Sequence, residues 1–167
     1  MFPIDAAAYI HLGYGAAWNA LAAGTGDATE KNGSYVSKKL ALQGGSAALT
    51  KKSPVARTCT LGVCWEATIA DTESFTLAGN LQDATSAAGA GVADYGTAAA
   101  AATIFTASGA ATNVNGYTAL LTEDLINSDE FIRGQVTPNL SASGTDDVDF
   151  IMVYVFSGFS EAPISAT

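Results

Sequence analysis

Apolar and polar residues alternate along much of the chain after residue 58, as they do in half-buried β-strands. Between Cys59 and Ile69 every odd position is apolar, while the even positions include Thr60, Gly62 and Glu66. The same alternation returns over residues 75–82, after a polar turn at 71–73. These two segments predict consecutive strands that form either a β-hairpin or a corner between two sheets.

A second pair of strands is predicted at residues 131–137 and 148–156, joined as a hairpin by a connection rich in Asn, Ser, Gly and Asp. The first strand is expected to stop at Pro138, which has no N–H to donate to a ladder. The second begins half-exposed at Asp149 and ends apolar on both faces. We therefore expect it in the centre of a sheet or at an interface.

Five to eight short strands separated by Gly, Ser, Asn and Asp turns predict an all-β fold, either a β-sandwich or a barrel, and of these we expect a jelly-roll-like β-sandwich as the body. Shorter strands are expected at 97–106 and 116–121. We assign residues 58–167 to the sandwich domain. Residues 1–57 lack clean alternation, and we assign them to an extended N-terminal arm with a basic segment.

The charge distribution distinguishes these two parts. The chain has a formal net charge of −9, with 16 acidic and 7 basic residues. Six of the basic residues fall in one segment that contains no acid, namely Lys31, Lys38, Lys39, Lys51, Lys52 and Arg57. The acidic balance argues against nucleic acid or an anionic membrane as the partner. The basic segment is either a solvated loop or a partner-binding arm that docks on an acidic surface, its own, a neighbour's or a scaffold's.

The search for chemistry returns no catalytic constellation, cofactor motif or metal site, and we predict that the chain is not an enzyme. His11 is the only histidine and has no neighbouring nucleophile. The acids of residues 146–149 form either a solvated turn or a weak calcium site, without the spacing of a calcium loop. Cys59 and Cys64 have opposite strand parity, which predicts two buried free thiols. The N-terminus does not read as a signal peptide, and no run is long enough for a membrane span.

Two segments carry a resemblance to a known family. Residues 74–97 read SFTLAGNLQDATSAAGAGVADYGT, and residues 131–158 read FIRGQVTPNLSASGTDDVDFIMVYVFSG. Both resemble the small β-rich head proteins of tailed bacteriophages that decorate or cement the capsid. The resemblance implies a virion protein, synthesised in the host cytoplasm, whose partner is the major capsid protein. It implies no enzymatic residues and gives Arg133 the role of a structural ion-pair partner.

The prediction for function is therefore a structural virion protein on the capsid surface that decorates and stabilises the capsid by bridging neighbouring subunits. Such bridging suits self-association into a homo-oligomer, for example a trimer around a lattice symmetry axis. The alternative is a carbohydrate-binding or adhesin subunit of a phage tail or cell surface, which would use exposed aromatic residues and a cation at the turn of residues 146–149.

Overall fold

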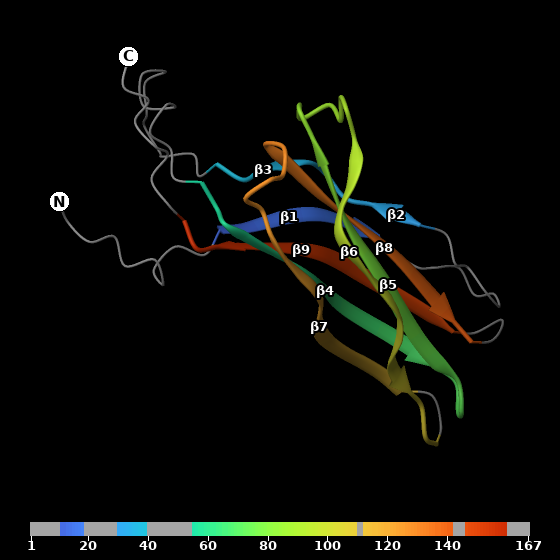
Figure 1. The fold of residues 1–167 in the computed structure, drawn as a ribbon. Coiled ribbons are helices and arrows are strands. Elements are labelled where there is room, and N and C mark those ends of the chain that lie inside the picture. The colour runs from blue at the N-terminus through green and yellow to red at the C-terminus, as the bar shows by residue number, and fades with distance from the viewer. Residues whose placement is uncertain (1–10, 19–29, 40–54, 110–111, 142–145, 160–167) are drawn as a thin grey trace, which may run out of the picture.

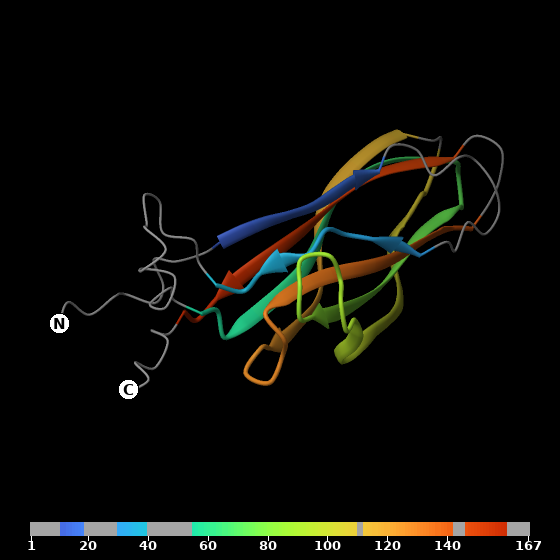
Figure 2. The same cartoon turned by 90° about the horizontal axis from the view of Figure 1, so that it is seen from above.

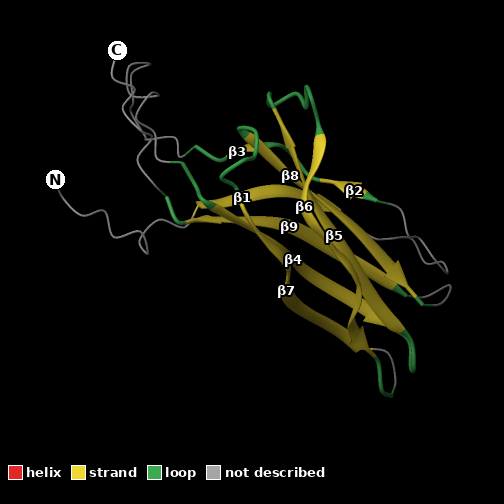
Figure 3. Cartoon of the chain, viewed as in Figure 1, coloured by secondary structure: helices red, strands yellow, loops and turns green. Residues whose placement is uncertain are grey.

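The computed structural model describes residues 11–18, 30–39, 55–109, 112–141 and 146–159. All regular secondary structure in these ranges is β-strand (Figure 3). The strands are β1 (His11–Trp18), β2 (Lys31–Asn32), β3 (Val36–Ser37), β4 (Thr58–Ile69), β5 (Ser74–Ala84), β6 (Ala93–Thr106), β7 (Thr112–Asp124), β8 (Phe131–Leu140) and β9 (Asp147–Ser157).

The strands form two antiparallel sheets that pack face to face (Figures 1 and 2). Sheet A has the order β1-β9-β4-β7. Sheet B has the order β2-β8-β5-β6, and β3 also pairs with β8. The predicted all-β sandwich is confirmed, and β9 lies inside sheet A between β1 and β4, as its two apolar faces indicated.

The order of the strands is that of a jelly roll. β2 and β3 pair with successive parts of β8, with one extra residue between them, so they act as two halves of one bulged strand. If β2 and β3 are counted as one strand, β1 pairs with β9, this combined strand with β8, β4 with β7, and β5 with β6. An antiparallel ribbon with this nested pairing is rolled up when β9 also pairs with β4, and β8 with β5.

The apolar parity of β4, β5, β8 and β9 points into the space between the sheets. In β4 the residues Cys59, Leu61 and Val63 have no exposed surface, and Trp65 packs on the core with its ring edge-on to Phe75, 5.8 Å between centroids. β9 alternates buried and more exposed residues over its whole length. The strands β4, β5 and β9 and their inward-facing residues were therefore predicted correctly, whereas β6 and β7 each begin four residues before their predicted starts at 97 and 116, and β7 runs on to Asp124.

Two predicted strand connections are crossings between the sheets, one of which had been predicted as either a hairpin or a corner and the other as a hairpin. β4 lies in sheet A and β5 in sheet B, so the turn at residues 71–73 is the corner that the pattern left open, and Thr72 adopts a left-handed φ of 67° there. β8 and β9 likewise lie in different sheets, so the predicted hairpin between them is wrong. Both hairpins and crossings keep one apolar parity facing the core, so alternation alone does not separate them.

β8 also continues beyond Pro138 to Leu140, which corrects the predicted end of this strand. The peptide carbonyls of Glu130 and Gly134 accept hydrogen bonds from the β2–β3 side. Backbone polar groups alternate between the two edges of a strand, so the nitrogen of Pro138 faces this same outer side. Its missing N–H therefore removes no hydrogen bond to β5.

The extended N-terminal arm is not found where the structure describes residues 1–57. β1 pairs with β9 at the edge of sheet A, and β2 and β3 complete the edge of sheet B. The predicted boundary at residue 57 therefore cuts through the sandwich. Short strands such as β2 and β3, with two residues each, are too brief to produce a readable alternation.

Tyr154 connects the two sheets through the core. It is fully buried on β9, and its hydroxyl accepts a hydrogen bond of 2.9 Å from the peptide N–H of Gly134 on β8. A Cβ on Gly33 would lie 1.9 Å from this hydroxyl, so the close approach of β2 requires glycine there. Burial raises the pKa of Tyr154 to about 12, because it disfavours the phenolate.

Candidate functional site

The outer face of sheet A carries a compact surface without charge. Three rows run across β9, β4 and β7, and residues opposite one another in neighbouring strands share a face. A bulge in β7 shifts the β4–β7 register by one residue between the second row and the third. The rows, which we call the sheet A patch, are Ile151–Cys64–Tyr117, Val153–Gly62–Ala119 and Val155–Thr60–Thr122. Tyr117 is 53% exposed and Ile151 is 36% exposed, although the core of the sandwich is complete without them.

Tyr117 lies over Gly62 in the middle of this patch. A Cβ on Gly62 would come within 2.4 Å of the Tyr117 hydroxyl, so the ring lies flat on the glycine of the neighbouring strand. The hydroxyls of Thr60 and Thr122 are paired at 2.7 Å, which satisfies them within the patch. The surface therefore offers an aromatic ring, aliphatic groups and satisfied hydroxyls to a partner.

Acidic rows border the sheet A patch at both ends. Beyond Cys64 the next row places Glu66 opposite Asp149. Beyond Thr60 the next row contains Thr58, with Asp124 opposite it on β7. An uncharged strip between two acidic ends complements a surface that is apolar in the middle and basic at its margins.

The free edge of sheet B is poorly suited to pairing with another strand. β6 is exposed along most of its length and has no charge from Gly96 to Thr106. Its register with β5 shifts at three places, so extra residues bulge out of the ladder. Bulges of this kind twist an edge and oppose edge-to-edge pairing. The contact surface of the protein is therefore better sought on a sheet face.

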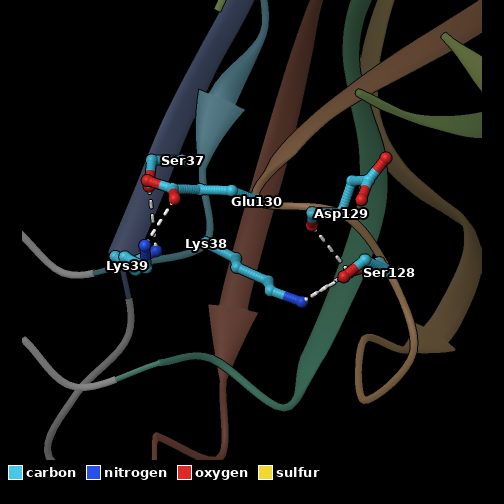
Figure 4. A network of polar contacts seen from close by, with 6 residues as sticks. All are labelled: Ser37, Lys38, Lys39, Ser128, Asp129 and Glu130. Atoms are coloured by element: carbon cyan, nitrogen blue, oxygen red, sulfur yellow. Dashed lines mark hydrogen bonds and ion pairs between the residues drawn. The ribbon is translucent and has the colours of Figure 1, made fainter. Parts of the chain in front are cut away.

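Two of the six basic residues, Lys38 and Lys39, are engaged within the chain (Figure 4). The Nζ of Lys38 donates to the carbonyls of Leu125 and Ser128, at 2.9 and 2.6 Å, and to the Ser128 hydroxyl at 2.9 Å. Lys39 forms an ion pair with Glu130, which also accepts a hydrogen bond from Ser37. These lysines fasten β3 to the turn between β7 and β8, so the acidic surface on which they dock is the chain's own.

Partial burial changes the pKa of Lys38. Desolvation lowers the pKa of its ammonium group, and the negative charges of Asp83 and Asp129 partly offset this effect. Asp83 is 8% exposed and accepts a hydrogen bond from the peptide N–H of Asp129. Lys38 is therefore a structural cation that closes the turn after β7.

The other predicted basic residues do not join one patch. Arg57 is exposed at the start of β4, where its peptide groups bond to Ser157 and Leu125. Lys31 lies on β2 opposite Val136, about 20 Å along β8 from the Lys38 contact at the strand rise of ~3.3 Å per residue. Lys51 and Lys52 lie outside the described residues.

Arg133 makes a different contact from the one implied by the resemblance. Its Nε and Nη2 both donate to Gln82 Oε1, at 2.8 and 2.6 Å, and Gln82 in turn donates to Asp94. Its guanidinium carbon lies 4.9 Å from the ring centroid of Tyr35. Within the described part of the chain Arg133 forms no ion pair, so this cation links neighbouring strands on the outer face of sheet B through hydrogen bonds to a neutral amide.

The acids predicted as a calcium site or a solvated turn are used for backbone contacts. Asp146 is buried and accepts a hydrogen bond from the peptide N–H of Ala70, and Asp147 accepts one from Thr68. No three metal-ligating side chains gather anywhere in the described ranges. His11 begins β1, where it is in register with Phe156.

The cysteines follow the predicted parity but not the predicted burial. Cys59 is fully buried, and burial raises the pKa of its thiol to about 12. Cys64 is exposed in the sheet A patch, so the prediction that both thiols are buried is wrong. Both are free thiols. Strand parity placed Cys64 on the outer face of its sheet. Its exposure could not be predicted from the sequence, because the sequence does not show that no other element packs on Cys64.

Comparison with known proteins returned no matching family model and no matching curated protein. Among the described residues there is no helix long and apolar enough to cross a membrane. The function is therefore argued from the surfaces of the sandwich alone.

Proposed function

We propose that this chain is a structural virion protein that decorates a phage capsid and stabilises it by bridging neighbouring capsid subunits. The observation that carries the proposal is the sheet A patch, an uncharged face on a sandwich whose core does not need it. Exposed apolar surface of this kind favours contact with another protein. The jelly roll supplies a rigid support for that face, and jelly rolls recur in viral capsid and lectin domains.

The partner we propose is a capsid subunit whose surface is apolar in the centre and basic at its margins. The acidic rows at Glu66 and Asp124 favour such a partner over a second copy of the same face. Two copies related by a twofold axis along or across the strands would bring acidic rows against acidic rows. Self-association, including the trimer expected from the sequence, would then use surfaces other than this face, and Lys31 and Arg57 remain candidate contacts.

The size of the patch indicates how the contact works. Three strands ~4.8 Å apart and three rows ~6.6 Å apart span about 300 Å². A standard stable interface buries about 800 Å² per partner. One patch is therefore the centre of a modest contact, and stabilisation of a lattice comes from many copies that each bridge two subunits.

The test is co-sedimentation with capsids assembled from the major capsid protein of the phage to which the proposal assigns this chain. We expect Ile151→Asp to weaken binding at least about tenfold, because it places a charge in the centre of the patch. Ala100→Asp is the matched control, since it adds the same charge on exposed β6. A second patch variant, Tyr117→Ser, removes the exposed aromatic ring of the patch, and circular dichroism and thermal unfolding check the fold of each variant.

Two results would contradict the proposal. The wild-type protein fails to co-sediment with these capsids, or both patch variants bind as tightly as Ala100→Asp. Binding that weakens as salt is raised supports the basic margin of the partner, because Glu66 and Asp124 then contribute screened attraction.

A further inference from the structure

A shallow depression lies on the outer face of sheet B, on the opposite side of the sandwich from the sheet A patch. It has a volume of about 170 Å³. Its floor consists of small residues, and polar side chains form its walls. The lining residues are Ala78, Gly79, Ala98 and Ala99 on the floor, and Glu30, Asn80, Gln135 and Thr137 on the walls.

An irregularity in strand pairing produces this depression. Gly79 is in register with Ala99, and Leu81 with Tyr95, so the single residue Asn80 faces three residues of β6. The extra residues move β6 away from β5 at this point and leave a gap over the sheet.

The walls contain polar groups whose hydrogen-bonding capacity is not used. In the part of the chain that the structure describes, the side chains of Asn80 and Thr137 form no hydrogen bond. Gln135 is 8% exposed and is held in place by donating to Glu30 at 2.7 Å and to Asn32 at 2.6 Å. A fixed amide and carboxylate thus stand beside a free amide and a free hydroxyl.

We propose that this depression binds a single neutral pyranose ring, either as a free sugar or as the end of a glycan. Asn80, Thr137 and the Glu30 carboxylate match a ligand with several hydroxyls, and the alanine methyl groups match the C–H face of a ring. The carboxylate and the net charge of −9 oppose an anion. The polar walls oppose a purely apolar ligand, and one carboxylate does not make a divalent metal site.

The proposed sugar site differs from the one considered from the sequence. It uses neither the turn of residues 146–149 nor a cation, so a chelator should have no effect on it. It is also independent of capsid binding, because the two sites are on opposite faces of the sandwich. Its volume is below the 300–1,000 Å³ typical of drug-sized ligands, which favours one ring over a buried oligosaccharide.

The experiment is an NMR titration of the ¹⁵N-labelled full chain with D-glucose, D-galactose, D-mannose and N-acetyl-D-glucosamine, followed by immobilised glycans that end in any sugar that binds. We expect saturable shifts of the Asn80 and Gln135 side-chain amides with at least one of these sugars, with a Kd in the millimolar range. Asn80→Ala should raise the Kd at least about fivefold, because it removes one hydrogen-bonding group. Asn115→Ala is the control, since it removes an exposed asparagine from the outer face of sheet A.

The absence of saturable shifts at these amides with every sugar, up to about 100 mM, would overturn the proposal. An unchanged Kd in both Asn80→Ala and Thr137→Val would also overturn it. So would saturation by ethylamine but by none of the sugars, because the depression would then bind an ammonium ion through the Glu30 carboxylate. Ile151→Asp should leave the sugar titration unchanged, so failure here and failure of capsid binding are separate results.

Discussion

The contact of Tyr154 with two glycines gives a quantitative test of the fold. The Tyr154 hydroxyl accepts the peptide N–H of Gly134 in a position with no access to water. In Tyr154→Phe this N–H loses its partner, and an unsatisfied buried donor costs about 1–3 kcal/mol. We therefore expect the free energy of unfolding to fall by that amount in urea, with an unchanged m-value.

Gly33 adds a second arm to this test. A methyl group on Gly33 would meet the Tyr154 hydroxyl at 1.9 Å, whereas the next atoms, Tyr154 Cζ and Met152 Sδ, are at 3.2 Å. Gly33→Ala should therefore destabilise the wild-type protein by about 1–3 kcal/mol through overpacking. In the Tyr154→Phe background most of this clash is removed, and the entropy gained by replacing glycine offsets part of the rest.

The two substitutions should consequently couple by at least about 1 kcal/mol in a double-mutant cycle. Tyr117→Phe is the control, because Tyr117 is 53% exposed and loss of its hydroxyl should change stability by less than about 0.5 kcal/mol. Additive effects of Gly33→Ala and Tyr154→Phe, within about 0.5 kcal/mol, would refute the contact between β2 and β9 across the core.

Three further predictions test other parts of the structure. Lys38→Met should destabilise the protein by about 2–3 kcal/mol in urea unfolding, because it removes charged hydrogen bonds to Leu125 and Ser128. Lys39→Met breaks only an exposed ion pair and should cost less than about 1 kcal/mol. Equal losses of stability in the two variants would contradict the assignment of Lys38 as the structural cation of this turn. Folding stability should fall as pH rises from about 8.5 to about 12, because the unfolded chain releases the protons of Cys59 and Tyr154 first, while burial raises both pKa values to about 12 in the folded state. A pH titration of the unfolding midpoint checks this, and Cys59→Ala should move the onset toward pH 10. A maleimide should modify one thiol per native chain, at Cys64, and a second, at Cys59, only after unfolding, as mass spectrometry would show.

The alternation of side chains predicted most of the fold because it reports burial directly. Cys59 to Ile69 and Val148 to Phe156 each bury one parity, as expected. Alternation does not report which strand pairs with which, so the crossing from β8 to β9 was predicted as a hairpin, and the corner between β4 and β5 was left as one of two alternatives. The partners of β9 are β1 and β4, which are distant in sequence, and only the closed core selects them.

The candidate surfaces were predictable to different degrees. The second apolar parity of β9, with Val153 and Val155, pointed to an interface before the structure was known. The lysines at 38 and 39 were read as partner contacts because a sequence does not show that Glu130 and Ser128 lie beside them. The sheet B depression left no signal in the sequence, because it arises from extra residues of β6 opposite Asn80, and alternation does not report strand register.

The central claim is that the sheet A patch is the surface that meets the capsid, and Cys64 reports on it directly. Cys59 is buried, so alkylation of the native protein follows Cys64 alone. The decisive measurement is the alkylation rate of Cys64 in free protein and in protein bound at saturation to capsids. The account predicts a rate at least about tenfold lower on the capsid, because Ile151, Cys64 and Tyr117 are then covered. Saturated binding with an unchanged Cys64 rate would contradict it.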